Sequence, residues 1–79
     1  MSSSEPQREF GVVLFHSVHG ALGAEKLLVG AAIPHKLIPV PRHISSNCGF
    51  CLRFQWCDRE RVEALLSGSK LGVEGIVAL

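Results

Sequence analysis

Apolar positions in the first half of the chain predict a buried strand followed by a helix. Residues 10–15 form a short continuous apolar run that is rich in β-branched and aromatic residues, which is typical of a central strand. Residues 17–32 carry apolar side chains at helical spacing, with Ser17 as the N-cap and an end expected near Ile33 and Pro34. The apolar positions of this helix are Ala21, Ala24, Leu27, Leu28, Ala31 and Ala32.

The rest of the chain predicts three further strands and one further helix. Residues 36–40 indicate an edge strand, because prolines within it and directly after it lack the N–H that a sheet ladder needs. Alternation of apolar and polar positions over residues 51–57 indicates a strand with one covered face. A helix is expected to follow Asp58 and to end near Gly68, and residues 73–79 form the last strand. One face of the alternating strand holds Leu52, Phe54 and Trp56, and the other holds Cys51, Arg53, Gln55 and Cys57.

The order strand, helix, strand, strand, helix, strand in a chain of 79 residues predicts an α+β fold of the ferredoxin-like βαββαβ type. In this sandwich a four-stranded antiparallel sheet of order 4-1-3-2 carries both helices on one face. The proline-bearing second strand then lies at an edge and the apolar first strand at the centre, as each pattern requires. We expect residues 1–8 to be a disordered tail and residues 9–79 to form one domain.

With helices on only one face, alternate residues of the first strand must look out through the open face. Two sets are compatible with the pattern, and a homodimer through that face would bury either of them. The sets are Phe10, Val12 and Leu14, or Gly11, Val13 and Phe15.

Composition narrows the functional classes. Hydrophobic residues make up 47% and charged residues 19%, which excludes a disordered chain. The formal net charge is +1 and the cations are dispersed, which argues against nucleic-acid binding. No apolar run approaches the roughly 20 residues of a membrane helix, and the start of the chain lacks a signal-peptide pattern. We therefore expect a cytoplasmic protein without membrane contact, and no motif calls for a cofactor.

The predicted topology gathers polar and reactive side chains at one end of the sheet. The first two strands run in the same direction, so the loops that follow them emerge at the same end, together with the loop of residues 67–72. A thiolate of Cys48 near the helix that begins after Ser17 would be favoured by the unpaired N–H groups there, by an imidazole and by Arg42. Gly49 would permit a close backbone approach or a positive φ. The groups expected around Cys48 are His16, Ser17, His19, Arg42, His43, Ser45, Ser46, Asn47 and Gly49.

Cys48 and Cys51 also form a C-x-x-C spacing, which occurs in dithiol redox sites and in zinc sites. The motif opens a strand here, whereas in thioredoxin-like proteins it opens a helix and in heavy-metal transport domains it follows the first strand. A zinc site would use His16, His43, Cys48 and Cys51, with His19 as an alternative ligand. Cys57 lies too far along an extended strand to join either site, so we interpret it as a passive thiol.

Several segments together resemble the selenium/sulfur carrier-like family of small bacterial proteins. They are Phe15-His16-Ser17 before a helix with Ala21, Glu25, Lys26 and Leu27, then Leu37-Ile38-Pro39-Val40-Pro41-Arg42, then Ser45-Ser46-Asn47-Cys48-Gly49. The resemblance covers nearly the whole chain after the Ser-rich start. It implies a carrier that holds a persulfide or perselenide on Cys48 and exchanges it with donor and acceptor proteins, rather than a turnover enzyme.

Given this resemblance, Cys51 is a candidate resolving thiol that would attack the loaded Cys48 and release sulfide or selenide. Two other functions stay open at the level of sequence. One is a thiol-redox or zinc-binding module that uses Cys48 and Cys51. The other is a non-catalytic dimeric regulatory or interaction domain, in which the cysteines are dispensable.

Overall fold

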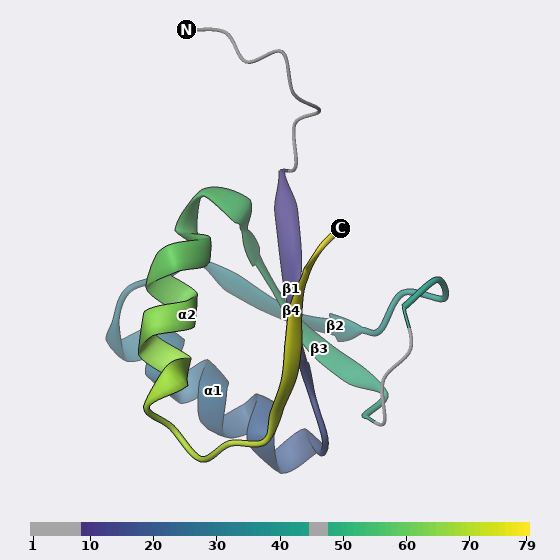
Figure 1. The fold of residues 1–79 in the computed structure, drawn as a ribbon, viewed down its shortest axis with the longest axis horizontal. Coiled ribbons are helices and arrows are strands. Elements are labelled where there is room, and N and C mark those ends of the chain that lie inside the picture. Colours follow the sequence, from purple (N-terminus) through teal and green to yellow (C-terminus); the bar gives the residue numbers. More distant parts are fainter. Residues whose placement is uncertain (1–8, 45–47) are drawn as a thin grey trace, which may run out of the picture.

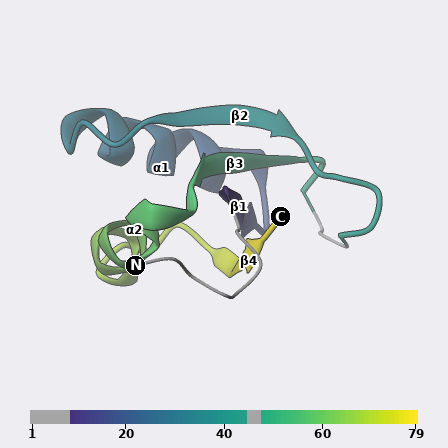
Figure 2. The same cartoon turned by 90° about the horizontal axis from the view of Figure 1, so that it is seen from above.

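The computed structural model describes residues 9–44 and 48–79. Its elements follow the predicted order, and the sheet order is β2-β3-β1-β4 with every neighbouring pair antiparallel. Both helices lie on the same side of this sheet (Figures 1 and 2). The predicted α+β ferredoxin-like arrangement is therefore confirmed. The elements are β1 (Phe10–Phe15), α1 (Val18–Gly30), β2 (His35–Pro39), β3 (Phe50–Gln55), a short 3₁₀ helix (Trp56–Asp58), α2 (Arg59–Ser67) and β4 (Val73–Ala78).

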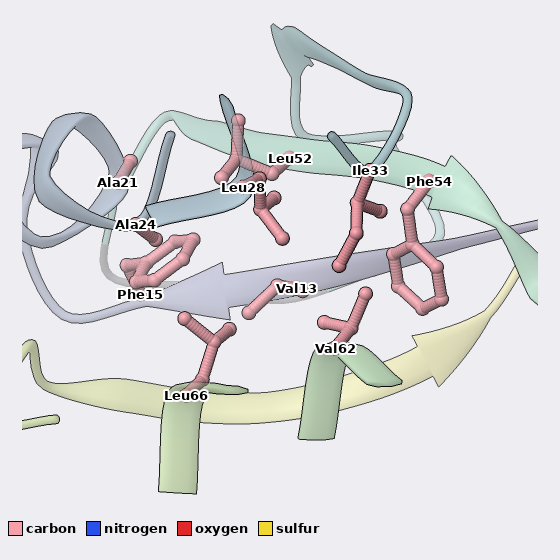
Figure 3. Close-up of a cluster of buried hydrophobic side chains, with 10 residues drawn as sticks. All are labelled: Val13, Phe15, Ala21, Ala24, Leu28, Ile33, Leu52, Phe54, Val62 and Leu66. Atoms are coloured by element: carbon pink, nitrogen blue, oxygen red, sulfur yellow. The ribbon is translucent and has the colours of Figure 1, made fainter. Parts of the chain in front are cut away.

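The main hydrophobic core fills the space between the helices and the sheet (Figure 3). Side chains of α1 and α2 meet there with alternate side chains of β1 and β3, because a strand sends every second residue to one face. Its members are Val13, Phe15, Ala21, Ala24, Leu28, Ile33, Leu52, Phe54, Val62 and Leu66. Burial of this apolar surface is the principal force that holds the helices on the sheet.

A second, smaller cluster covers the centre of the face without helices. Val12, Leu14 and Cys51 are buried there, so β1 turns Phe10, Val12 and Leu14 to the open face. Three further side chains pack against this cluster, namely Ile38, Val40 and Ile44. A homodimer through this face would need an exposed apolar strand. Because the chain itself buries Val12 and Leu14, the open face of β1 gives no support to a dimer at this place.

The edge position of β2 explains how it tolerates proline. The N–H of Val40 donates to the carbonyl oxygen of Gly49 at 3.0 Å, and ladder bonds recur at every second residue of an antiparallel pair. The nitrogen of Pro39 therefore points out of the sheet, where no N–H is needed. This confirms the edge strand, which begins and ends one residue earlier than the sequence predicts.

The alternating strand ends before Trp56, which the pattern places inside it. Trp56 begins the 3₁₀ helix, yet its ring still stacks on Phe54 with 5.9 Å between centroids. Its indole lies directly over Gly11, where a Cβ atom would come within 2.4 Å of the ring. The tryptophan thus keeps its predicted place in the core although the strand has ended. Within the described residues, no helix has the length and apolar character needed to span a membrane.

Helix α1 ends in a Schellman motif that has alanine where glycine is preferred. The N–H of Ile33 donates to the carbonyl of Leu28 at 2.9 Å, and that of Ala32 donates to Val29 at 3.0 Å. Ala32 adopts a φ of 57°, in the left-handed region that is unfavourable for residues with a Cβ atom. Ile33 and Leu28 meet in the core, which completes the hydrophobic contact of the motif.

We therefore expect Ala32→Gly to stabilise the protein by about 0.5–1 kcal/mol, since glycine relieves the backbone strain although it gains entropy in the unfolded chain. The measurement is the free energy of unfolding in urea. Ala31→Gly is the control, because the φ of Ala31 is −92° and glycine there only adds unfolded-state entropy. A stability of Ala32→Gly at or below that of the parent would contradict the strain argument.

Candidate functional site

Cys51 lies inside β3 on the face of the sheet opposite the helices. It pairs across the sheet with Leu14 on β1 and with Ile38 on β2, and its side chain is fully buried. The strand alternation therefore points Cys51 away from the helices and into the second hydrophobic cluster. The neighbouring apolar side chains leave no water to solvate a thiolate at this position.

Cys48 lies three residues earlier, where the chain enters β3, and it is buried with a relative exposure of 6%. Gly49 and Phe50, which follow it, are exposed. If the antiparallel register of β1 and β3 is continued from the Leu14 and Cys51 pair, Cys48 comes level with Ser17, where β1 passes into α1. Both segments lie at the same end of the sheet (Figure 1). Cys48 is therefore buried at the end of the sheet where the sequence predicts it, next to exposed residues.

The environment of Cys51 changes its acid–base behaviour. Burial, and secondly the charge of Cys48, raises the pKa of Cys51 from 9.0 to about 11. At neutral pH only about one Cys51 in ten thousand is ionised, so Cys51 is a protonated thiol in the folded protein. The charge of Cys48 contributes to this shift, so the two cysteines lie near each other. Of this pair, Cys48 is the candidate nucleophile.

The raised pKa of Cys51 predicts a loss of stability at alkaline pH. The unfolded chain releases this proton near pH 9.0 and the folded chain near pH 11, so between these values the unfolded state binds fewer protons. Raising the pH then favours unfolding, by roughly 1.4 kcal/mol per pH unit. Below pH 9 the stabilisation is fully present. Urea unfolding at a series of pH values measures the slope.

Two variants, each with one cysteine replaced, test the origin of this slope. Cys51→Ala should remove the contribution of Cys51 to the slope, whatever the variant loses in packing. Cys57→Ala should retain it, because Cys57 is exposed in the 3₁₀ helix, where its Sγ donates to Gln55 Oε1 at 3.9 Å. If both variants keep the parent's alkaline slope, Cys51 does not cause it.

His16 belongs to the predicted end of the sheet but lies toward β4. Its backbone N–H donates to Gly72 at 2.9 Å, and its Nδ1 lies 3.5 Å from a carboxylate oxygen of Glu74. Strand β4 flanks β1 on the side opposite to β3, which Cys48 precedes. The loops after β1 and before β4 therefore meet as expected, but this imidazole is directed away from the cysteine pair.

The other predicted groups are placed as follows. Ser17 is the N-cap of α1 in extended conformation, without a side-chain capping bond, and His19 is exposed in the first turn. Arg42 and His43 are exposed in the turn that the N–H of Ile44 closes onto Pro41. Ser45, Ser46 and Asn47 lie outside the described residues. Throughout residues 9–44 and 48–79, no three His, Cys, Asp or Glu side chains gather as metal ligands, so the zinc set of His16, His43, Cys48 and Cys51 is not assembled.

The sequence predicts a positive φ or a close backbone approach at Gly49, and neither is found among the described residues. Its φ is not positive, since among the described glycines only Gly72 has that conformation, at 71°. An added Cβ at Gly49 would also meet no atom of the described residues within 4 Å. The backbone of Gly49 serves instead to anchor the loop, because its carbonyl accepts the N–H of Val40. The glycine with a conformational role at this end of the sheet is Gly72, beside the ring of His16.

The apolar side chains that cover Cys51 are not among the features predicted from the sequence. Ile38 and Val40 continue the alternation of β2 past Pro39, and Ile44 follows the turn. This alternation was a usable signal in the sequence. The many polar residues of segment 41–48 hide this signal, because they favour an exposed loop.

Residues 10–78 match the protein family described as "Putative Se/S carrier protein-like". The chain belongs to this family. The match runs from the first residue of β1 to the last residue of β4, so the Se/S carrier-like region includes the whole sheet, both helices and the Cys48–Cys51 pair. No curated protein and no solved structure matches the chain.

Proposed function

We propose that this member of the Se/S carrier-like family holds sulfur or selenium on Cys48 and passes it between donor and acceptor proteins. The observation that carries the proposal is the asymmetry of the cysteine pair. Cys51 is fully buried within β3 with a pKa of about 11, whereas Cys48, although also buried, has a relative exposure of 6% and lies in a bend beside exposed Gly49. Membership of the family supports the choice of cargo.

Loading is an exchange that needs no external oxidant. The Cys48 thiolate attacks the terminal sulfur of a donor persulfide, a new S–S bond forms on Cys48, and the donor S–S bond breaks with its electron pair leaving on the donor thiolate. Selenium reacts in the same way through an S–Se bond. The resulting persulfide or perselenide is anionic, and the start of α1 at this end of the sheet supplies unpaired N–H groups that suit an anion.

Delivery is proposed to run in the reverse sense, onto the thiolate of an acceptor. The alternative route, in which Cys51 attacks Cys48 and expels sulfide or selenide with formation of a disulfide, requires the Cys51 thiolate. With a pKa of about 11 that thiolate is scarce at neutral pH, so this route is slow there and quickens with alkaline pH. The pKa of Cys51 therefore favours transfer of the cargo over its release.

Intact-mass analysis tests the proposal. The purified, reduced protein is incubated with a persulfide donor or a perselenide donor, and we expect a mass increase of one sulfur or selenium atom that a thiol reductant reverses. Equal masses before and after every such incubation would refute the carrier. A dithiol redox module predicts instead the loss of two hydrogen atoms on oxidation, without added chalcogen.

A further inference from the structure

Two cations lie directly opposite each other on the open face. Lys36 of β2 pairs with Arg53 of β3 in the antiparallel register, so their Cβ atoms are about 5 Å apart. Among residues 9–44 and 48–79, no carboxylate reaches salt-bridge distance of either side chain. Like charges in this arrangement destabilise the sheet. The described residues therefore offer no contribution to stability that would explain why two cations stand opposite each other.

A hollow in the surface adjoins these two cations. Its volume is about 360 Å³, and its lining includes Lys36, Arg53, Phe10 and Gln55. Phe10 pairs with Gln55 in the register of β1 and β3, which puts all four on the open face and next to one another. The guanidinium of Arg53 lies over the Phe10 ring, 4.4 Å from its centroid, and this contact fixes its orientation while leaving its N–H edge to bind a ligand.

We propose that Lys36 and Arg53 form a binding site for a small oxyanion, with phosphate or a carboxylate group as the recognised chemistry. A doubly charged oxyanion would accept hydrogen bonds from the guanidinium edge and the ammonium group at once, and would remove the repulsion between them. The amide of Gln55 adds a neutral donor at the margin. Glu9 is the acidic residue that borders this region, in a neighbouring hollow that shares Phe10 and Gln55.

The proposed site is separate from the thiol chemistry but shares its face. Arg53 lies two residues after Cys51 on the same face of β3, about 7 Å along the strand. Lys36 stands in the same relation to Ile38, which covers Cys51. The inference does not rest on the carrier proposal, because neither Lys36 nor Arg53 takes part in the chemistry at Cys48.

Binding is measured by NMR titration of ¹⁵N-labelled protein with inorganic phosphate, and separately with citrate, at constant ionic strength set by chloride. We expect saturable shifts at the amides of Lys36, Arg53 and Gln55, and the two arms show whether phosphate or carboxylate is preferred. Lys36→Ala and Arg53→Ala should each weaken binding at least tenfold. Lys26→Ala is the matched control, since Lys26 is an exposed lysine of α1, and it should leave the affinity unchanged.

Lys36→Glu separates binding from folding. A glutamate opposite Arg53 replaces repulsion with attraction, so this variant should melt at a higher temperature than the parent and yet lose oxyanion binding. Shifts that grow linearly without saturation in both arms, or equal affinities in the parent and Lys36→Ala, would overturn the site. A melting temperature of Lys36→Glu below the parent's would overturn the argument that the unpaired cations are held at the expense of stability.

Discussion

Cys48→Ala is expected to abolish the mass gain of one sulfur or selenium atom that the proposed carrier shows. Cys48 and Cys51 are both buried, but Cys48 has a relative exposure of 6%, whereas Cys51 has none. A donor persulfide must bring its terminal sulfur within bonding reach of the attacking thiolate, and Cys48 lies in a bend beside exposed Gly49, nearer to the surface than Cys51 within β3. The measurement is the fraction of loaded protein by intact mass, at a donor concentration that loads the parent once.

Cys57 provides the matched control for this experiment, because it is the exposed cysteine and thus the most accessible to a non-specific donor. Cys57→Ala should load as the parent does, and Cys51→Ala should also keep its adduct. Loading that disappears in Cys57→Ala and persists in Cys48→Ala would place the reactive thiol in the 3₁₀ helix. The assignment to Cys48 would then be wrong.

Gly20→Ala is expected to destabilise the protein by about 2–3 kcal/mol, although alanine normally stabilises a helix interior relative to glycine. A Cβ atom at Gly20 would lie 2.1 Å from the carbonyl oxygen of Leu71. This obstacle is backbone and not a flexible side chain, so α1 or the loop before β4 must shift. In a domain of this size, the loss corresponds to a fall in melting temperature of roughly 10 °C or more.

Two other glycines of α1 are matched controls for Gly20. At Gly30 an added Cβ meets nothing within 4 Å, so Gly30→Ala should stabilise by about 0.5–1 kcal/mol. At Gly23 the nearest atom is Cδ2 of the Leu71 side chain, at 2.7 Å, which can rotate away, so the effect should be smaller than at Gly20. Equal free energies of unfolding of Gly20→Ala and Gly30→Ala in urea would show that the loop before β4 shifts without cost, and the prediction for Gly20 would be wrong.

The order of elements and the class of the fold followed from the sequence, because local patterns of apolar residues report which faces are buried. The continuous run at residues 10–15, the prolines around β2 and the alternation of β3 each fixed one strand, and chain connectivity then left few ways to arrange them. The same patterns placed the caps at Ser17, Asp58 and Gly68. The predicted alternation of β3 extended too far at Trp56 and Cys57, which belong to the 3₁₀ helix.

The Cys48 and Cys51 pair shows best what the sequence determines and what depends on the tertiary structure. The sequence by itself determined that Cys48 and Cys51 lie at one end of a ferredoxin-like sheet, and its motifs indicated the Se/S carrier-like family. Only the tertiary structure decided that Cys51 faces away from the helices, under Ile38, Val40 and Ile44, with a pKa of about 11. It also decided which side of β1 His16 occupies and that Lys36 meets Arg53. These properties depend on contacts between distant segments, and no local pattern encodes the desolvation or the charge that such contacts impose.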